Sequence, residues 1–194
     1  MKNHSYIETI KSVDGKLLHL PYHQKRYAEV LKSLGVDMVH DLNQCVRPPS
    51  EGTFRCRMVY TSCDIAVSYH EYKKRKINTL KLVFDNDIQY SQKFLNRDSI
   101  DALFSQKGDA EDILIIKNLL VSDTSIANIA LFRGGMWMTP KTPLLKGTTR
   151  ERLLQEGKII EADIRVSELR TFSQVALLNA MIDFDILDTF EFLL

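Results

Sequence analysis

Short strand-like runs separated by turn residues recur along most of the chain, and this pattern constrains the fold more than any other feature. The first run, YIETIKSVDGKLLHL (residues 6–20), alternates apolar and polar residues on both sides of Asp14-Gly15. This dipeptide is favoured in two-residue type I′ turns, so the run predicts a β-hairpin. Three further runs rich in β-branched and aromatic residues follow, namely TFRCRMVYTS, IAVSYHEYK and INTLKLVF. With the hairpin they predict an antiparallel sheet.

One helix is predicted within this first part of the chain, over residues 21–35 (PYHQKRYAEVLKSLG). Pro21 occupies a first-turn position, Gly35 stands where helices commonly end, and apolar residues recur between them at helical spacing. The helix would place His23 and Arg26 on one face, one turn apart.

The pattern becomes more mixed after residue 84, and DNDIQYSQ (residues 85–92) has the character of a crossing segment into a second unit. A helix is predicted in RDSIDALFSQKGD, and another after the loop LLKGTT. Short strands are predicted in DILIIKN, LLVSDTS, ANIALF, GMWMTP, IIEADI and QVALLNAM. We therefore expect an α+β fold in two domains, a small one over residues 1–86 and a larger one over residues 87–194.

Composition excludes several classes of protein. The 194 residues are 44% hydrophobic and carry 26 basic and 25 acidic side chains, as is usual for a globular protein. A net charge of +1 gives no electrostatic reason to expect a nucleic-acid partner or an anionic membrane. The basic run YKKRKI (residues 72–77) has no aromatic stacking platform beside it, so we interpret it as a solvated connection.

The cysteines and histidines do not form a recognisable metal site. Three cysteines without CxxC spacing disfavour a disulfide framework or a zinc site and suggest a reducing compartment. The five histidines show no paired metal-ligand spacing. The N-terminal residues contain no apolar signal core, and no apolar run is long enough to span a membrane, so we expect a cytoplasmic protein.

Two segments could carry chemistry. In KGTTRERLL, Gly147 lets the backbone approach a ligand, and the helix that follows directs free N–H groups toward the loop, as a phosphate site requires. The alternative is that Thr149 only caps this helix. In YSQKFLNR, Lys93 is either a solvated charge or a reactive amine.

Five blocks in this order, YSQKFLNR, SDTSIANIALF, MTP, LLKGTTR and LLNAM, resemble those of the class IV aminotransferases, the fold-type IV enzymes that use pyridoxal 5′-phosphate. The resemblance extends from about Tyr6 to about Leu187. QKFLNR and LLNAM are most similar to the corresponding blocks of 4-amino-4-deoxychorismate lyases.

The resemblance implies a role for particular residues. Lys93 would form a Schiff base with the cofactor aldehyde. Asp123 would hold the proton of the pyridine nitrogen, at a position where most of the family has glutamate, five residues before Asn128. His23 and Arg26 match an H-x-x-R block that binds the cofactor phosphate.

The remaining cofactor contacts implied by the resemblance lie late in the chain. Gly147, Thr148, Thr149 and Arg150 match a G-[IV]-T-R loop that also binds the phosphate. Asn179 and Ala180 match a late strand that approaches the cofactor; Ala180 has no hydroxyl to offer, so a contact there would come from backbone or from Asn179.

The family context further implies a cofactor between the two domains, a small-molecule amino substrate and a homodimer. The activities to be distinguished are that of a 4-amino-4-deoxychorismate lyase and that of a D-amino acid or branched-chain aminotransferase. A non-catalytic cofactor-binding partner is a third possibility.

Relative to the family pattern, the chain starts almost at its first block, stops early, and has Lys11 where arginine is common. We therefore expect a trimmed form of the fold, with an altered substrate pocket or altered subunit contacts.

Overall fold

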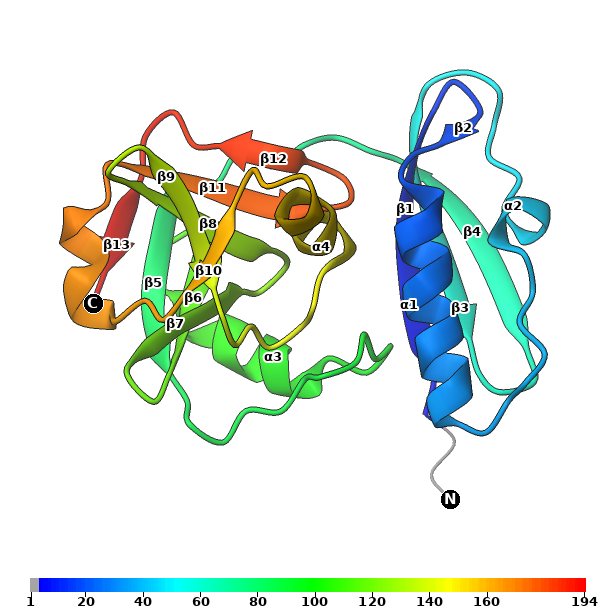
Figure 1. Ribbon diagram of the computed structural model, residues 1–194, viewed down its shortest axis with the longest axis horizontal. Coiled ribbons are helices and arrows are strands. Elements are labelled where there is room, and N and C mark those ends of the chain that lie inside the picture. The colour runs from blue at the N-terminus through cyan, green and yellow to red at the C-terminus, as the bar shows by residue number, and fades with distance from the viewer. Residues whose placement is uncertain (1–3) are drawn as a thin grey trace. The chain divides into compact units, whose positions relative to one another are not determined.

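The computed structural model describes residues 4–194 and divides the chain into two compact units (Figure 1). The N-terminal unit comprises the chain up to Lys74 together with Gln92–Asn96. The C-terminal unit comprises Arg75–Ser91 and Arg97–Leu194. Each unit has its own sheet and its own hydrophobic core.

The N-terminal unit is built on a four-stranded antiparallel sheet in the order β2-β1-β3-β4. Its strands are β1 (Tyr6–Val13), β2 (Lys16–Leu17), β3 (Thr53–Tyr60) and β4 (Ile65–Glu71). The predicted hairpin is confirmed: β1 and β2 are joined by Asp14 and Gly15, whose φ angles of 47° and 77° are those of a type I′ turn.

Helix α1 (Leu20–Ser33) lies across one face of this sheet (Figure 1), as the spacing of its apolar residues predicts. Its buried residues Tyr27, Val30 and Leu31 join a core that includes Ile10 and Tyr60 of the sheet. The rings of Tyr27 and Tyr60 meet edge to face at 4.8 Å. A single-turn helix, α2 (Leu42–Cys45), follows and buries Leu42.

The segment that carries Lys93 is bound to the edge of β1 by main-chain hydrogen bonds. The Ile7 N–H donates to the Lys93 carbonyl at 2.9 Å, and the Leu95 N–H donates to the Ser5 carbonyl at 2.8 Å. The rings of Tyr6 and Phe94 pack at 5.3 Å beside these bonds. Lys93 is therefore part of the N-terminal unit, although it is far from β1 in sequence.

The C-terminal unit contains a larger mixed sheet. Its main path runs β10-β9-β8-β7-β6-β5-β13, and β8 also pairs with β11, which pairs with β12. The strands are β5 (Thr79–Phe84), β6 (Asp112–Lys117), β7 (Leu120–Thr124), β8 (Asn128–Arg133), β9 (Met136–Pro140), β10 (Ile160–Ala162), β11 (Gln174–Asn179), β12 (Asp183–Ile186) and β13 (Glu191–Leu193). The helices are α3 (Asp98–Phe104) and α4 (Thr148–Gln155), with the 3₁₀ turns η1 (Ser105–Lys107) and η2 (Val166–Thr171). The predicted α+β fold, with a small sheet and a larger one, is confirmed.

The sheet partner predicted for residues 77–84 was wrong. The segment does form a strand, β5, but β5 pairs in parallel with β6 and β13 of the C-terminal unit instead of extending the N-terminal sheet. Leu80 of β5 is fully buried in the core of that unit. A strand pattern indicates that a segment is extended but does not specify its partner, and these partners are distant in sequence. Residues 75–86 thus lie in the C-terminal unit.

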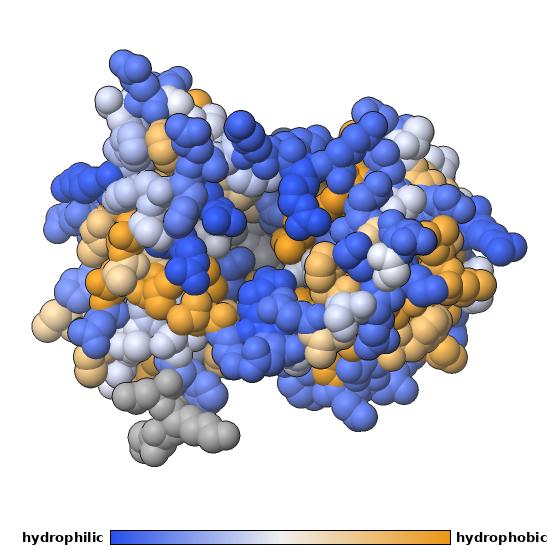
Figure 2. Space-filling view, turned by 180° about the vertical axis from the view of Figure 1, so that it is seen from behind, coloured by the Kyte–Doolittle hydropathy of each residue, from blue (hydrophilic) through white to orange (hydrophobic). Residues whose placement is uncertain are grey.

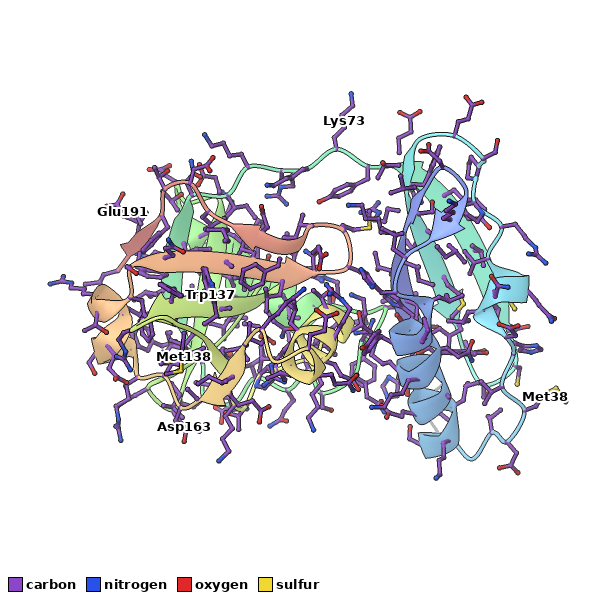
Figure 3. All side chains as sticks on the ribbon, turned by 45° about the horizontal axis from the view of Figure 1, so that its top comes forward. Met38, Lys73, Trp137, Met138, Asp163 and Glu191 are labelled. Atoms are coloured by element: carbon purple, nitrogen blue, oxygen red, sulfur yellow. The ribbon has the colours of Figure 1, made fainter. Side chains whose placement is uncertain are left out.

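Strand β6 is the centre of this unit. Four consecutive residues, Ile113 to Ile116, are fully buried, which requires packing on both faces of the strand. Trp137 of β9, which is labelled in Figure 3, lies in the C-terminal unit. It packs against Phe132 and, edge to face at 4.9 Å, against Phe184. Its interpretation as a packing residue agrees with these contacts.

The surface mixes hydrophilic and hydrophobic residues on the face of each unit shown in Figure 2. Lys73, in the basic run, is exposed and extends away from the ribbon (Figure 3). In residues 4–194, no helix is both long and apolar enough to cross a lipid bilayer.

Truncating the centre of the C-terminal core should destabilise that unit strongly. Leu114 is fully buried, so Leu114→Ala should lower its free energy of unfolding by about 2–5 kcal/mol through lost burial and a residual cavity. Leu119→Ala, in the turn between β6 and β7, removes the same atoms from a residue that is 62% exposed. It should change the free energy of unfolding by less than about 0.5 kcal/mol. Urea unfolding followed by circular dichroism would measure both; equal effects would contradict the assignment of β6 as the centre of the core.

Candidate active site

Two predicted site residues, His23 and Arg26, meet a third residue on β1 that sequence reasoning missed. The Arg26 guanidinium donates from Nε to Glu8 Oε1 at 2.7 Å and from Nη2 to Glu8 Oε2 at 2.6 Å. His23 Nδ1 lies 2.8 Å from the same Oε2. A carboxylate can only accept hydrogen bonds, so Nδ1 carries the proton in this contact.

The pKa values show which groups are charged. Burial alone would raise the pKa of the fully buried Glu8, but Arg26 and His23 outweigh it and lower this pKa to about 2. The pKa of His23 is lowered, chiefly by burial and further by the charges of Arg26 and Lys93, although Glu8 opposes the shift. At neutral pH the cluster is thus an ionised carboxylate held by a guanidinium and a neutral imidazole.

A signal for Glu8 was present in the sequence. Strand β1 alternates buried and partly buried residues, and Glu8 falls between Tyr6 and Ile10 on the buried face. A carboxylate in that register needs a buried partner, and α1 supplies two with the spacing of one helical turn.

Lys93 belongs to the same unit as this cluster. Its backbone is held by β1, its side chain is partly buried, and its charge contributes to the lowered pKa of His23. The N-terminal unit therefore brings together Lys93, Arg26, His23 and Glu8, three of which the sequence singled out.

The second group of predicted residues lies in the C-terminal unit and centres on the buried Asp123. Asp123 Oδ1 accepts from Asn128 Nδ2 at 2.7 Å, and Asp123 Oδ2 accepts from the Leu145 N–H at 2.9 Å. Asn128 Nδ2 also donates to the Leu145 carbonyl at 2.8 Å. The carboxylate at the end of β7 and the amide at the start of β8 thus fix the loop that leads into α4.

Burial dominates the acidity of Asp123. It raises the pKa of this carboxyl to about 6, while the Leu145 N–H, the Asn128 amide and the charge of Arg150 act in the opposite direction. Unlike Glu8, Asp123 has no cation among these hydrogen-bond partners. A positive group brought to this carboxylate would stabilise its ionised form.

Gly147 is required by the same network. A Cβ atom at this position would lie 2.1 Å from Asn128 Oδ1, which is far inside van der Waals contact. The φ angle of Gly147 is −72°, which any residue can adopt, so the constraint is one of space. Only glycine allows the loop to pass this close to Asn128.

Helix α4 begins directly after Gly147, which is its N-cap. The alternative in which Thr149 caps the helix is wrong, because Thr148 and Thr149 already lie within the first turn, and within the described chain no side chain caps it. The N–H groups of a first turn have no intrahelical partner, and the helix dipole places positive charge there. This buried helix start can therefore bind an anion such as a phosphate.

Arg150, the last residue of the matched loop, has structural partners. Its Nη2 donates to the Pro140 carbonyl at 2.7 Å and to Glu161 at 2.6 Å, which ties α4 to the paired strands β9 and β10. The neighbouring Arg152 forms ion pairs with Glu156 and Asp183. These contacts fix the orientation of the helix whose first turn faces the loop.

Asn179 shapes the turn between β11 and β12. Its Oδ1 accepts from the N–H groups of Met181 and Ile182 at 2.9 and 3.1 Å, and its Nδ2 donates to the Ile126 carbonyl at 3.3 Å. The turn that contains Ala180 is thereby linked to the turn between β7 and β8, which follows Asp123.

Cys45, Cys56 and Cys63 are free thiols, and among residues 4–194 no three His, Cys, Asp or Glu side chains form a metal-binding group.

The chain is similar to known proteins over nearly its whole length. The sequence profile described as "Amino-transferase class IV" matches residues 5–184. An "uncharacterized protein" of Haemophilus influenzae is 37% identical over 180 residues, which cover 90% of this chain and 96% of that protein.

Solved structures agree in fold. A "putative 4-amino-4-deoxychorismate lyase" from Haemophilus somnus is 33% identical, with a TM-score of 0.86 over 93% of this chain and 98% of that one. The pyridoxal-phosphate-bound form of a "hypothetical aminotransferase" from Mycobacterium tuberculosis is 14% identical and has a TM-score of 0.80 over 98% of this chain and 82% of that one. At that identity the likeness shows the fold alone.

Adding one methyl group at Gly147 should disturb the loop before α4. Gly147→Ala should destabilise the C-terminal unit by about 1–3 kcal/mol, because either the loop or the Asn128 side chain must move. Lys146→Ala, at the adjacent exposed position, should change stability by less than about 0.5 kcal/mol. Chemical unfolding would measure both, and adding Asn128→Ala to Gly147→Ala should give a less than additive effect. Additive losses would show that the two residues do not interfere.

The raised pKa of Asp123 should appear in the pH dependence of stability. The unfolded chain loses this proton at its ordinary pKa of 3.8 and the folded chain at about 6, so stability falls as pH rises between these values. Asp123 should contribute a fall in the free energy of unfolding on the order of 3 kcal/mol, and Asp123→Asn should remove that contribution. Urea unfolding of the cofactor-free protein from pH 3.5 to 7 would measure it. The same slope in both proteins would assign it to other groups.

Proposed function

The chain belongs to the class IV aminotransferase family, and from this we propose that it is a pyridoxal 5′-phosphate enzyme whose reactive amine is Lys93. The observation that carries the proposal is the network of Asp123, Asn128, Leu145 and Gly147. It connects a buried carboxylate to a helix start suited to an anion. Pyridoxal 5′-phosphate needs both, since it has a basic ring nitrogen and a phosphate.

The residues present fit this cofactor. The buried Asp123 carboxylate can hold the proton of a pyridinium nitrogen, and the cation would favour its ionised form. The first turn of α4, with Thr148 and Thr149, offers N–H and hydroxyl donors to the phosphate. When bound, the cofactor supplies an electron sink for carbanion chemistry.

The proposal also uses two groups of the N-terminal unit. Lys93 provides the amine for covalent attachment, on a segment fixed by two main-chain hydrogen bonds. Arg26 provides a cation for the phosphate, held in place by the buried Glu8. In this proposal Asn128 and Asn179 act by shaping the loops around the cofactor, and Ala180 contributes only backbone.

For the reaction, we propose a lyase that releases pyruvate from 4-amino-4-deoxychorismate. The Haemophilus somnus relative, at 33% identity, is described as a "putative" lyase of this kind, and the QKFLNR and LLNAM blocks resemble those lyases. Amino transfer between D- or branched-chain amino acids and a keto acid is the second candidate, because it uses the same lysine, carboxylate and phosphate-binding groups. We propose a homodimer, as is usual in the family.

Covalent attachment at Lys93 is the first test of this proposal. Purified protein incubated with pyridoxal 5′-phosphate should turn yellow, and borohydride should bleach it and leave a single modified peptide at Lys93. Lys93→Ala should show neither change and no turnover, whereas Lys107→Ala, which removes an ammonium group that donates to the Gly108 and Ala110 carbonyls, should behave as the native protein does. Colour and turnover retained in Lys93→Ala would overturn the assignment. A native protein that never turns yellow would instead favour a non-catalytic module.

The reaction itself is decided by a substrate comparison. Pyruvate release from 4-amino-4-deoxychorismate should be at least tenfold faster per enzyme than amino transfer from any D- or L-amino acid to 2-oxoglutarate. The reverse order would make the chain an aminotransferase and would leave the cofactor assignment intact.

A further inference from the structure

The hydrogen bonds of Glu8 fix one edge of the Arg26 guanidinium. Glu8 accepts from Nε and from Nη2, the paired geometry in which a carboxylate sets the plane of an arginine as well as its position. His23 donates to Glu8 Oε2 at 2.8 Å, so three hydrogen bonds hold a carboxylate that is 0% exposed.

We propose that Glu8 is a positioning residue that orients Arg26 toward the phosphate of the cofactor, with His23 holding Glu8 in place. The inference rests on the proposed function and deepens it. It adds to the site a residue that would not itself touch the cofactor and that acts only through Arg26.

Stability alone gives a weak reason for this cluster. Ionised side chains are costly to bury, and a buried ion pair is commonly no more stable than apolar residues of the same size. Ile10, the next buried residue on the same face of β1, shows that an aliphatic side chain fits this layer. A pre-oriented cation, in contrast, gives a direct reason for a carboxylate at this place.

An arginine without such a partner would bind less well. Its long side chain samples many rotamers, and a ligand that orders it must offset the lost conformational entropy. The side chain of Arg26 is only 12% exposed, so its head group is already confined near the surface of the unit. Glu8 fixes the remaining freedom before a phosphate arrives.

Charge and position predict opposite outcomes when Glu8 is neutralised. If only charge mattered, Glu8→Gln would remove an anion beside Arg26 and would strengthen phosphate binding. If positioning matters, Glu8→Gln would loosen the guanidinium and weaken phosphate binding. We expect positioning to dominate, because the two hydrogen bonds to Glu8 set both the place and the plane of the guanidinium.

The test compares two ligands, pyridoxal 5′-phosphate and pyridoxal, which differ only by the phosphate. In absorbance titrations, Glu8→Gln should bind pyridoxal 5′-phosphate about tenfold more weakly than the native protein and pyridoxal equally well. Arg26→Ala should lower the affinity for pyridoxal 5′-phosphate about ten- to a hundredfold and leave the affinity for pyridoxal unchanged. In that background, Glu8→Gln should cause no further loss.

Controls separate positioning from folding. Ile10→Val perturbs the same buried face of β1 without touching a charge, and its affinity for both ligands should match the native value. His23→Gln keeps the ion pair between Glu8 and Arg26. It should lose less affinity than Glu8→Gln, again only for pyridoxal 5′-phosphate. It therefore replaces Glu8→Gln in the test if that variant does not fold.

Each outcome has a single reading. Unchanged or tighter binding in Glu8→Gln, equal losses for the two ligands, or a further loss in the Arg26→Ala background would overturn the role of Glu8. A native protein that binds neither ligand would instead overturn the proposed cofactor.

Discussion

The hydrogen bond from the Leu145 N–H to the Asp123 carboxylate determines the course of the chain at the candidate site. It holds the loop before α4 against the end of β7, and Asn128 reinforces it by bonding both to the carboxylate and to the Leu145 carbonyl. With the loop in this position, Gly147 must pass Asn128 with no room for a side chain, and α4 must begin immediately afterwards. The positions of the helix start, the buried carboxylate and the glycine therefore depend on one another.

Glu8 and Asp123 show how differently two buried carboxylates can behave. Glu8 is surrounded by a guanidinium and an imidazole, which keep its pKa at about 2. Asp123 accepts hydrogen bonds from neutral amides, and burial raises its pKa to about 6. The first is therefore ionised throughout the physiological range, as suits a residue that holds an arginine. The second ionises more easily when a cation approaches, as the proposed pairing with a protonated ring nitrogen requires.

Local patterns in the sequence predicted most of the elements but not all of their partners. The Asp14-Gly15 hairpin, α1 and the start of α4 follow from turn chemistry and spacing that act within a few residues. The place of β5 in the C-terminal sheet did not follow from local patterns, because its pairing with β6 and β13 depends on residues far along the chain. Glu8 escaped notice because its significance depends on the helix that covers β1. Lys93 was selected only through the family resemblance, since no local feature distinguishes it from other lysines.

The segment Gln92–Asn96 belongs to the N-terminal unit, while the residues on both sides of it belong to the C-terminal unit. Neither unit is therefore a continuous piece of chain, and a single cut after Lys74 would separate the N-terminal unit from the segment that pairs with β1. During synthesis, β1 to β4 emerge before the segment Gln92–Asn96, which pairs with the edge of β1. Because main-chain bonds attach that segment to β1, a displacement of the units would carry Lys93 together with Glu8, His23 and Arg26. The Lys93 amine and the Arg26 guanidinium would thus move as one body.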